Sequence, residues 1–555
     1  MRPSPSAGCH PPAPAGVGSA TCEARRVAVS FLVDGRPAHV ADDGASLLEA
    51  LRDELGVRSA KDGCSPQGQC GCCTVLVDGH PRVACVTPVR RVAGRGVTTL
   101  AGMPEAARWA EAFAAYGASQ CGFCTPGIIV RLAARAREGP LTPAAVEEAL
   151  VAHLCRCTGW RTIIDAAVAA SADGSLPAQP GAGAAARATL EGGAPQRVGP
   201  DVALGGGGCA DDGPPDDALV AVPGSDGGWV TGATLGAART AAAKVQGRRS
   251  TVPLVWPIAV PPGEWDVVLR TTWVEPAYLE PDASWCAPGG TPASPVANGG
   301  AFGSKRQSPV AAAARALAEM HGRAVRALWA REDVVRFGPK RPPLAAGVRS
   351  DGTGVVRVAR TPGIAAAIAA VAPGLVVEEV DVAGPPTSAD VRAAGWAEAA
   401  VLLAAIEARA HPTALPSATV ASPTGGWATA TIAADGAIDL RVAAGDPLDD
   451  VVLRSYCIGA AHQGLGWVTS EGIAVGADGT VHDLTIRSFG ILRAAQTPPV
   501  RVDIVLPGVP PPGRAGPAPV EPVNGSDAAF AAVAAATWIA RGLTPAWPTD
   551  PRRST

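Results

Sequence analysis

The sequence predicts a multidomain α+β protein, and three changes of pattern along the chain support this. Residues 27–102 alternate short strand patterns with glycine turns, whereas residues 103–170 read almost wholly as helix. Residues 256–545 mix strand patterns with Ala-rich helices. The chain has 555 residues, enough for three or four domains of about 150 residues each. A single small domain is therefore excluded.

The first unit is expected to begin with a hairpin. Residues 27–33 and 38–40 are apolar strand patterns joined by an Asp-Gly-Arg-Pro turn at 34–37. Residues 46–55 then predict a helix, because four leucines share one of its faces. These elements together predict a small α+β unit.

Residues 1–26 are rich in Pro, Gly and Ala, which predicts a disordered leader ahead of the hairpin. A twin-arginine signal at Arg25-Arg26 is the alternative interpretation. The apolar run that follows ends at Asp34, however, and no small-residue cleavage site comes after it. We therefore expect a strand rather than a targeting signal.

The helical unit is interrupted at 125–126, 139–140 and 158–159 by Thr-Pro, Gly-Pro and Thr-Gly pairs. After it, residues 171–215 consist largely of Gly, Ala, Pro and Asp, which predicts a linker. The four glycines at 205–208 read as part of this linker rather than as a phosphate loop, because no strand leads into them and no helix follows.

Charge and hydropathy exclude two classes of partner. Lys and Arg number 47 and Asp and Glu number 50, a net charge of −3, and no block of like charges stands out, so we expect no nucleic-acid partner. The longest apolar stretches, residues 363–377 and 528–540, are shorter than the roughly 20 residues of a spanning helix. We expect no membrane span.

Cysteine usage points to metal. Of 14 cysteines, most lie between Cys64 and Cys157, and the others are scattered singly. Clustering within a long, otherwise Cys-poor chain favours metal ligation over a disulfide scaffold. The expected compartment is reducing, which places the protein in the cytoplasm.

The first cysteine group lies on a glycine-rich loop, and its spacing is C-x5-C-x2-C with a further cysteine twelve positions later. A 2Fe-2S cluster needs four thiolates and nearby backbone N–H groups, which glycines allow. The spacing is one residue longer than in plant-type ferredoxins. Zinc is disfavoured because paired C-x2-C knuckles are absent. The predicted ligands are Cys64, Cys70, Cys73 and Cys85, with Cys72 as a substitute for Cys73.

The second cysteine group consists of a Cys-x-x-Cys and a Cys-x-Cys pair about thirty residues apart. A threonine follows each pair and can cap a new helix, so two helix N-termini are expected to converge. Their free N–H groups would stabilise an anionic cluster. A redox-active Cys-x-x-Cys is the alternative, but it leaves the Cys-x-Cys pair unexplained. The predicted 2Fe-2S ligands are Cys121, Cys124, Cys155 and Cys157.

The order of these motifs resembles the iron–sulfur portion of the xanthine dehydrogenase and aldehyde oxidoreductase family, the molybdenum hydroxylases. The resemblance rests on the ferredoxin-like loop, QCGFCTPG at 120–127 and CRCTGW at 155–160. It implies a β-grasp ferredoxin domain over 27–102 and a helical-bundle domain over 103–170, each holding a 2Fe-2S cluster. In that family the clusters pass electrons from a molybdenum–pterin site towards flavin or another acceptor.

The resemblance continues beyond the linker in abbreviated form. It implies a small α/β domain over 216–255 and an abbreviated α+β molybdopterin-binding region over 256–545. Residues 298–305, NGGAFGSK, resemble the loop that passes close to the metal, where glycines let backbone N–H groups approach the cofactor. An ordinary glycine-rich turn is the alternative. The implied cofactor-binding residues are Gln120, Gly299, Gly300, Phe302 and Gly303.

Hydroxylation in this family needs a carboxylate that takes a proton from metal-bound hydroxide while hydride passes to the metal centre. The resemblance implies Glu521 as this general base, because Glu521-Pro522 precedes an Ala-rich helix, although one residue out of register. Arg392 matches an arginine that contacts substrate in the family. A solvated surface residue is the alternative for each.

Several features depart from the family pattern. The molybdenum-binding region is shortened and lacks the Gly-Gln-Gly stretch that helps hold the pterin phosphate. Val274 replaces a glutamine beside the metal, and Arg306 stands where xanthine-oxidising members carry a glutamate, which disfavours a purine substrate. A flavin domain is missing, so we expect no FAD in this chain and a separate flavin subunit or another acceptor, in a homo- or hetero-oligomer.

Three functions are compatible with these features. The first is a molybdopterin oxidoreductase that hydroxylates an aldehyde or N-heterocycle, a small-molecule substrate, and passes electrons through two 2Fe-2S clusters. The second is a non-catalytic 2Fe-2S electron-transfer subunit of a molybdenum hydroxylase complex. The third, a cluster-based redox sensor, lacks a DNA-binding basic patch.

Overall fold

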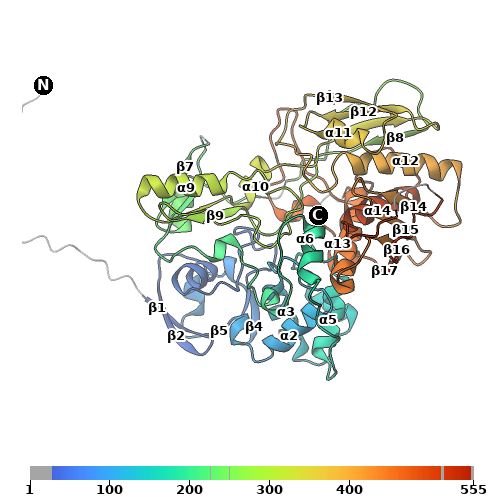
Figure 1. The fold of residues 1–555 in the computed structure, drawn as a ribbon. Coiled ribbons are helices and arrows are strands. Elements are labelled where there is room, and N and C mark those ends of the chain that lie inside the picture. The colour runs from blue at the N-terminus through green and yellow to red at the C-terminus, as the bar shows by residue number, and fades with distance from the viewer. Residues whose placement is uncertain (1–27, 226, 249, 514–517, 552–555) are drawn as a thin grey trace, which may run out of the picture.

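The computed structural model describes residues 28–225, 227–248, 250–513 and 518–551 (Figure 1). The expected leader, residues 1–26, lies outside the described residues. Strands form four separate sheets, and helices pack between and over them, so the fold is a multidomain α+β fold. None of the described helices is both long and apolar enough to cross a bilayer.

The first sheet has five strands in the order β2-β1-β5-β3-β4. They are β1 (Ala28–Val33), β2 (Arg36–Ala41), β3 (Thr74–Val77), β4 (His80–Val83) and β5 (Gly96–Thr98). β1 and β2 pair antiparallel and form the expected hairpin, whose turn places Asp34 and Gly35 at positive φ. The expected helix is short: α1 (Leu47–Glu49) continues as the π-helical turn η1 (Ala50–Glu54).

Four helices follow the first sheet. They are α2 (Ala106–Ala115), α3 (Thr125–Ala136), α4 (Pro143–Ala149) and α5 (Arg161–Ser171). Each expected interruption lies between or at the start of these helices, and Pro126 stands in the first turn of α3. Their inner faces are apolar and share one core with the first sheet.

Residues 171–215 are more ordered than the expected linker. They contain α6 (Ala184–Gly192) and α7 (Pro200–Ala203). Arg187 of α6 is fully buried, pairs with Glu191 at 3.0 Å and donates to the carbonyl oxygens of Pro447 and Val523. This segment is therefore fixed by contacts with residues more than 250 positions later, which local composition does not reveal.

A four-stranded sheet follows in the order β7-β6-β10-β9. Its strands are β6 (Leu219–Pro223), β7 (Trp229–Gly232), β9 (Ala283–Cys286) and β10 (Val325–Leu328), and α8 (Leu235–Ala241) and α9 (Val310–His321) pack against it. The sheet thus draws two strands from beyond residue 255. The small unit expected over 216–255 is completed by later segments of the chain.

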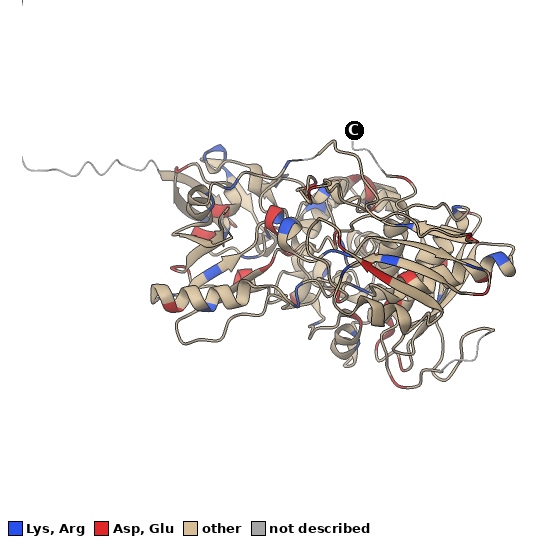
Figure 2. Cartoon of the chain, turned by 90° about the horizontal axis from the view of Figure 1, so that it is seen from above, with Lys and Arg blue, Asp and Glu red and all other residues tan. Residues whose placement is uncertain are grey.

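The C-terminal region holds the other two sheets (Figure 1). One contains β8 (Val267–Arg270), β11 (Leu344–Val348), β12 (Gly354–Ala359) and β13 (Leu375–Val380). The other contains β14 (Ser417–Ala421), β15 (Trp427–Ile432), β16 (Ile438–Ala443) and β17 (Val500–Ile504). Acidic and basic residues are interspersed over the elements drawn in Figure 2.

Helices form the centre of this C-terminal region. They are α12 (Trp396–Ala410), α13 (Asp450–Thr469) and α14 (Ser526–Ala540). α11 (Ile364–Ala369) packs on β13 and α12, and α10 (Arg331–Phe337) is tied to α8 by the Arg239–Glu332 ion pair. α14 is apolar on nearly all sides because neighbouring elements bury it all round. Glycines let α13 approach α14 closely: a Cβ at Gly464 would lie 2.5 Å from the carbonyl oxygen of Phe530.

Candidate metal centres

The four cysteines of the first group come together in the interior. The loop between η1 and β3 supplies Cys64, Cys70 and Cys73, and the segment after β4 supplies Cys85; all four thiols are free and buried. The Cys64 thiol contacts those of Cys70 and Cys85, and Cys85 also contacts Cys73. Hydrogen bonds from Cys70 and Cys85 lower the pKa of Cys64 well below its ordinary value. Thiolates are the form that binds iron.

Backbone N–H groups point at the sulfur atoms of this loop. The amides of Gln67 and Gln69 donate to Cys64 Sγ at 3.1 and 3.5 Å, and the amide of Cys85 donates to Cys73 Sγ at 3.4 Å. Such donors stabilise the negative charge of an iron–sulfur cluster. The donor set and its amides therefore fit a 2Fe-2S cluster.

Cys72 lies beside the group without completing it. Its sulfur is near Cys70 and donates weakly to the Cys70 carbonyl oxygen at 3.9 Å. Cys73 contacts Cys85, the fourth cysteine of the group. This geometry favours Cys73 over Cys72 as the ligand.

The second group forms two close pairs of thiols. Cys121 and Cys157 lie with their sulfur atoms 3.5 Å apart, and Cys124 contacts Cys155. The hydrogen bond from Cys124 lowers the pKa of Cys155 to about 6. Paired thiols suit a 2Fe-2S cluster, whose four cysteine ligands are shared between two irons. Within the described residues, no group of three or more His, Cys, Asp or Glu side chains is arranged to hold a single metal ion.

Two helix N-termini do meet this second group, since α3 and α5 begin just after its cysteines. The expected threonine caps are wrong, however. The hydroxyl of Thr125 hydrogen-bonds to Ser119, and that of Thr158 contacts Cys155 Sγ at 3.1 Å. Each hydroxyl therefore has a side-chain partner, Ser119 for Thr125 and Cys155 for Thr158, in place of a backbone amide of the helix.

The two thiol groups adjoin each other. A Cβ at Gly127, in the first turn of α3, would overlap the carbonyl oxygen of Gly71 and would lie 2.7 Å from that of Cys72. The amide of Leu154 donates to the carbonyl oxygen of Cys70 at 3.0 Å. The loop of the first group thus packs directly on the helix and chain segment that carry the second.

The glycine-rich loop at 298–305 covers the second group. A Cβ at Gly300 would lie 3.1 Å from Cys121 Sγ and 3.4 Å from Cys157 Sγ. Asn298 donates to the carbonyl oxygen of Gln120, and the Gln120 side chain donates to that of Cys157 at 3.1 Å. Gln120 and Gly300 therefore lie beside the second thiol group, whereas Gly299 packs against Gln196. Phe302 and Gly303 continue past them at positive φ.

The position expected for a molybdenum site holds only a small cavity, of about 30 Å³. Phe302, Arg392 and Val274 line it, so the structure brings these sequence-predicted residues together. Arg156, between two predicted ligands, reaches into the same place and forms a two-pronged ion pair with Glu471, with Nη2–Oε2 at 2.7 Å.

The other two arginines that line this cavity are also ion-paired. Arg392 donates to Asp527 at 2.9 Å and to Ser526 at 2.7 Å. Arg341 pairs with Glu398 at 2.7 Å and its guanidinium lies over the ring of Trp467. The charged groups at the cavity are thus neutralised by the chain itself.

A molybdopterin does not fit this cavity. A volume of 30 Å³ is about that of one water molecule in the liquid, whereas pockets for small-molecule cofactors measure roughly 300–1,000 Å³. The paired Arg156 and Glu471 are among the side chains that line it. Opening it would require breaking a buried ion pair.

Glu521 is exposed and does not line this cavity. Its backbone oxygen instead packs against Gly445. The structure therefore does not bring Glu521 and Arg392 to one site. The residues that sequence reasoning missed are Glu471 and Arg341. Neither carries a local signal, because each acquires its partner from a distant segment.

Comparison with known proteins matches the helical part to a family described as a [2Fe-2S] binding domain, over residues 99–168. The xanthine dehydrogenase iron-sulfur-binding subunit of Escherichia coli O157:H7 is 38% identical over 146 residues, which are 25% of this chain and 91% of that protein. This confirms the predicted 2Fe-2S character of the N-terminal part.

The aldehyde oxidoreductase of Megalodesulfovibrio gigas is 39% identical over 143 residues, but these are only 15% of its length. The sequence match with this longer relative is thus confined to about a quarter of the present chain, 24%.

The solved aldehyde oxidoreductase from Desulfovibrio gigas has a similar fold over most of both chains. The TM-score is 0.64 at 15% sequence identity, and the match covers 92% of this chain and 97% of that chain. At this identity the likeness shows the fold alone. It extends through the C-terminal region, beyond the iron–sulfur part.

Proposed function

Because the chain belongs to the xanthine dehydrogenase and aldehyde oxidoreductase family of oxidoreductases, we propose that it is the electron-transfer subunit of a molybdenum hydroxylase complex. It holds two 2Fe-2S clusters in series. The ligands of the first are Cys64, Cys70, Cys73 and Cys85, and the ligands of the second are Cys121, Cys124, Cys155 and Cys157.

The contact between the two thiol loops supports this relay. Clusters bound at adjoining loops exchange single electrons without a further carrier. The small cavity where the resemblance places molybdenum lies beside the second group, whereas Cys85 of the first group lines an open cavity and its neighbour Val86 is exposed. Electrons therefore enter at the second cluster and leave from the first, towards a flavin subunit or another acceptor.

The observation that carries this proposal is the small volume of the cavity beside the second group. With about 30 Å³ of space, and with Arg156 and Arg392 both engaged by carboxylates of the same chain, no room is left for a pterin or its substrate. The C-terminal region then serves as a scaffold that shields the second cluster and docks a partner subunit.

A second candidate function is favoured by the fold likeness over most of the chain. In this alternative the chain is itself a hydroxylase of an aldehyde or N-heterocycle, with Arg392 contacting substrate and Glu521 as general base. It requires the Arg156–Glu471 pair to separate and the segment around Glu521 to move inward.

Elemental analysis of the anaerobically purified native protein, with any partners separated afterwards, distinguishes the two. We expect about four iron atoms per chain, as two 2Fe-2S clusters require, and molybdenum only in a partner. Four iron atoms with one molybdenum in this chain would establish the hydroxylase instead. Clearly fewer than four iron atoms would contradict both.

A further inference from the structure

Arg331, the first residue of α10, is a buried cation bound to the loop of the first thiol group. Its side chain is fully shielded from solvent. The Nη2 atom donates to the carbonyl oxygens of Gly63 and Leu279, each at 2.7 Å. Gly63 directly precedes Cys64, a predicted ligand of the first cluster. A side chain 268 positions later in the sequence thus holds the backbone of this loop.

The backbone at Gly63 lies against sulfur atoms of the first group. A Cβ at Gly63 would lie 3.1 Å from Cys70 Sγ and 3.1 Å from Cys72 Sγ. Cys70 is a predicted ligand of the first cluster. The Arg331 guanidinium is therefore separated from the sulfur atoms of this cluster by a single glycine.

The charge of Arg331 is not neutralised by an ion pair in the part of the chain that the structure describes. The polar partners of its guanidinium there are the two carbonyl oxygens and the face of Tyr278, whose ring centroid lies 5.8 Å away. Two buried carboxylates of the same region have other partners. Glu275 pairs with Lys340 at 2.9 Å, and Asp282 accepts from the Tyr278 hydroxyl at 2.6 Å. Because a guanidinium stays protonated in proteins, Arg331 carries a permanent positive charge.

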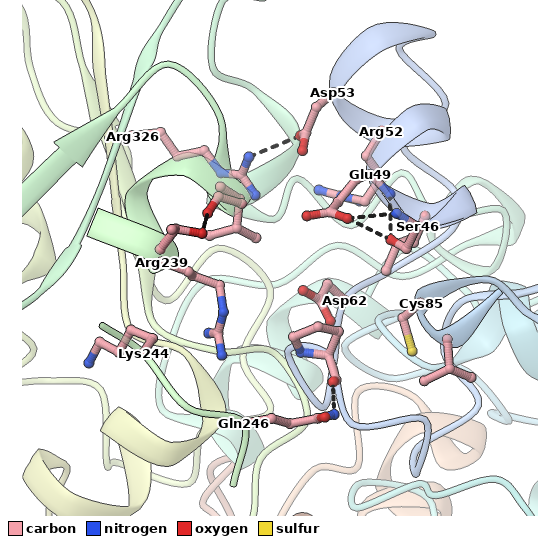
Figure 3. A pocket seen from close by; sticks show the side chains of 16 residues that line it. Ser46, Glu49, Arg52, Asp53, Asp62, Cys85, Arg239, Lys244, Gln246 and Arg326 are labelled. Carbon is pink, nitrogen blue, oxygen red and sulfur yellow. Dashed lines mark hydrogen bonds and ion pairs between the residues drawn. The ribbon is translucent and has the colours of Figure 1, made fainter. Parts of the chain in front are cut away.

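Other cations around the first thiol group are paired with carboxylates. At the open cavity on its edge, Arg326 lies 3.1 Å from Asp53 (Figure 3). Lys61, on the thiol loop, pairs with Asp212. The two charges of an ion pair largely cancel at a distance, whereas the charge of Arg331 acts on the loop directly.

We propose that the charge of Arg331 raises the reduction potential of the first cluster relative to that of the second. The inference rests on the proposed function, since it concerns the relay between two bound clusters. Reduction adds one electron, and a nearby cation stabilises the added negative charge. In the relay one electron leaves the reduced second cluster, which returns to its oxidised state, and enters the first; no bond or proton is transferred. Arg331 thus favours the direction from the second cluster to the first.

The test is a redox titration of the full-length protein, read by electron paramagnetic resonance. The signal of the first cluster is identified by its loss in Cys64→Ser. A unit charge about 10 Å away changes an equilibrium about tenfold at an effective dielectric constant of about 20. Arg331→Met should therefore lower the ratio of reduced to oxidised first cluster about tenfold at a fixed potential, which is about 59 mV for a one-electron couple. The second cluster should shift clearly less.

Three further variants separate the charge of Arg331 from its packing. Arg331→Gln keeps an amide donor without the charge and should lower the first potential as Arg331→Met does. Arg331→Lys keeps the charge and should restore most of the parent value. Arg336→Met removes an exposed arginine from the same helix. As the matched control it should leave both potentials unchanged, because water screens an exposed charge.

An unchanged first potential in Arg331→Met, or an equal shift of both clusters, would overturn the inference. If Arg331→Met does not retain its iron, the comparison of Arg331→Gln with Arg331→Lys decides instead, and equal potentials in these two would contradict the effect of charge. Absence of two reducible clusters in the unsubstituted protein would contradict the proposed function. Two reducible clusters with an unmoved first potential would contradict the inference alone.

Discussion

Buried polar side chains are arranged in opposite ways in the two thiol groups and in the small cavity beside the second group. The eight predicted ligands are gathered as like groups, and backbone amides donate to sulfur atoms of the first group. In the neighbouring cavity every arginine has its own carboxylate. The first arrangement supplies donors for a prosthetic group, whereas the charges of the second neutralise one another.

The largest expected effect distinguishes Cys73 from Cys72, because sequence spacing alone leaves open which of them is a ligand of the first cluster. Cys73→Ser should lower the iron content from about four to about two atoms per chain, because it removes one ligand of the first cluster. Cys72→Ser, the matched control, should retain about four. The measurement is iron and acid-labile sulfide per chain, and iron loss in Cys72→Ser with retention in Cys73→Ser would exchange their roles.

The next prediction tests whether the Arg156–Glu471 pair stabilises the small cavity without a ligand. Glu471→Gln leaves the buried Arg156 guanidinium without its counter-charge, and we expect a loss of about 3–5 kcal/mol in the free energy of unfolding. Urea denaturation at constant cluster content measures it.

The double variant Arg156→Leu, Glu471→Leu removes both charges and should regain most of that stability. If Glu471→Gln were instead neutral or stabilising, the pair would resemble a functional site retained at the expense of stability. That result would favour the hydroxylase.

The protonation of His462, which feels the charge of Arg156, provides a smaller test in the same region. Burial, followed by the charge of Arg156, lowers the pKa of His462 to about 4, while its Nε2 lies 3.0 Å from the Leu492 carbonyl oxygen. A histidine with a lowered folded-state pKa contributes stability above its unfolded pKa of about 6.5, and this is lost as pH falls towards 4.

Between pH 6.5 and pH 5 the expected loss from His462 is about 2 kcal/mol. His462→Gln should flatten this part of the stability profile measured by urea denaturation, whereas the exposed His411→Gln should not. An unchanged slope in His462→Gln would show that the histidine is not held neutral.

The smallest effect concerns the loop over the second thiol group. Gly300 and Gly289 both have positive φ, at +77° and +69°, but only Gly300 faces sulfur atoms. Both alanine variants carry the same backbone strain, so Gly300→Ala should be less stable than Gly289→Ala by about 1 kcal/mol. It should also alter the resonance of the second cluster alone. Equal behaviour would place the loop away from the cluster.

Local signals predicted the parts of the molecule that local geometry determines. The cysteine spacings predicted both thiol groups, and alternating apolar residues with an Asp-Gly turn predicted the β1–β2 hairpin. The shape of the small cavity beside the second thiol group could not be predicted, because Arg156 and Glu471, which pair there, are 315 positions apart in the sequence. The same reason explains α6, whose Arg187 is held by residues that the composition of its own segment cannot anticipate.

The loop that covers the second thiol group has a consequence for exposure to air. Dioxygen destroys iron–sulfur clusters that it can reach, and Gly300 stands directly over Cys121, the least buried of the eight cysteines. The lifetime of that cluster outside an anaerobic chamber is therefore governed by residues 298–303. A chain cut before this loop would bleach faster at its second cluster than at its first.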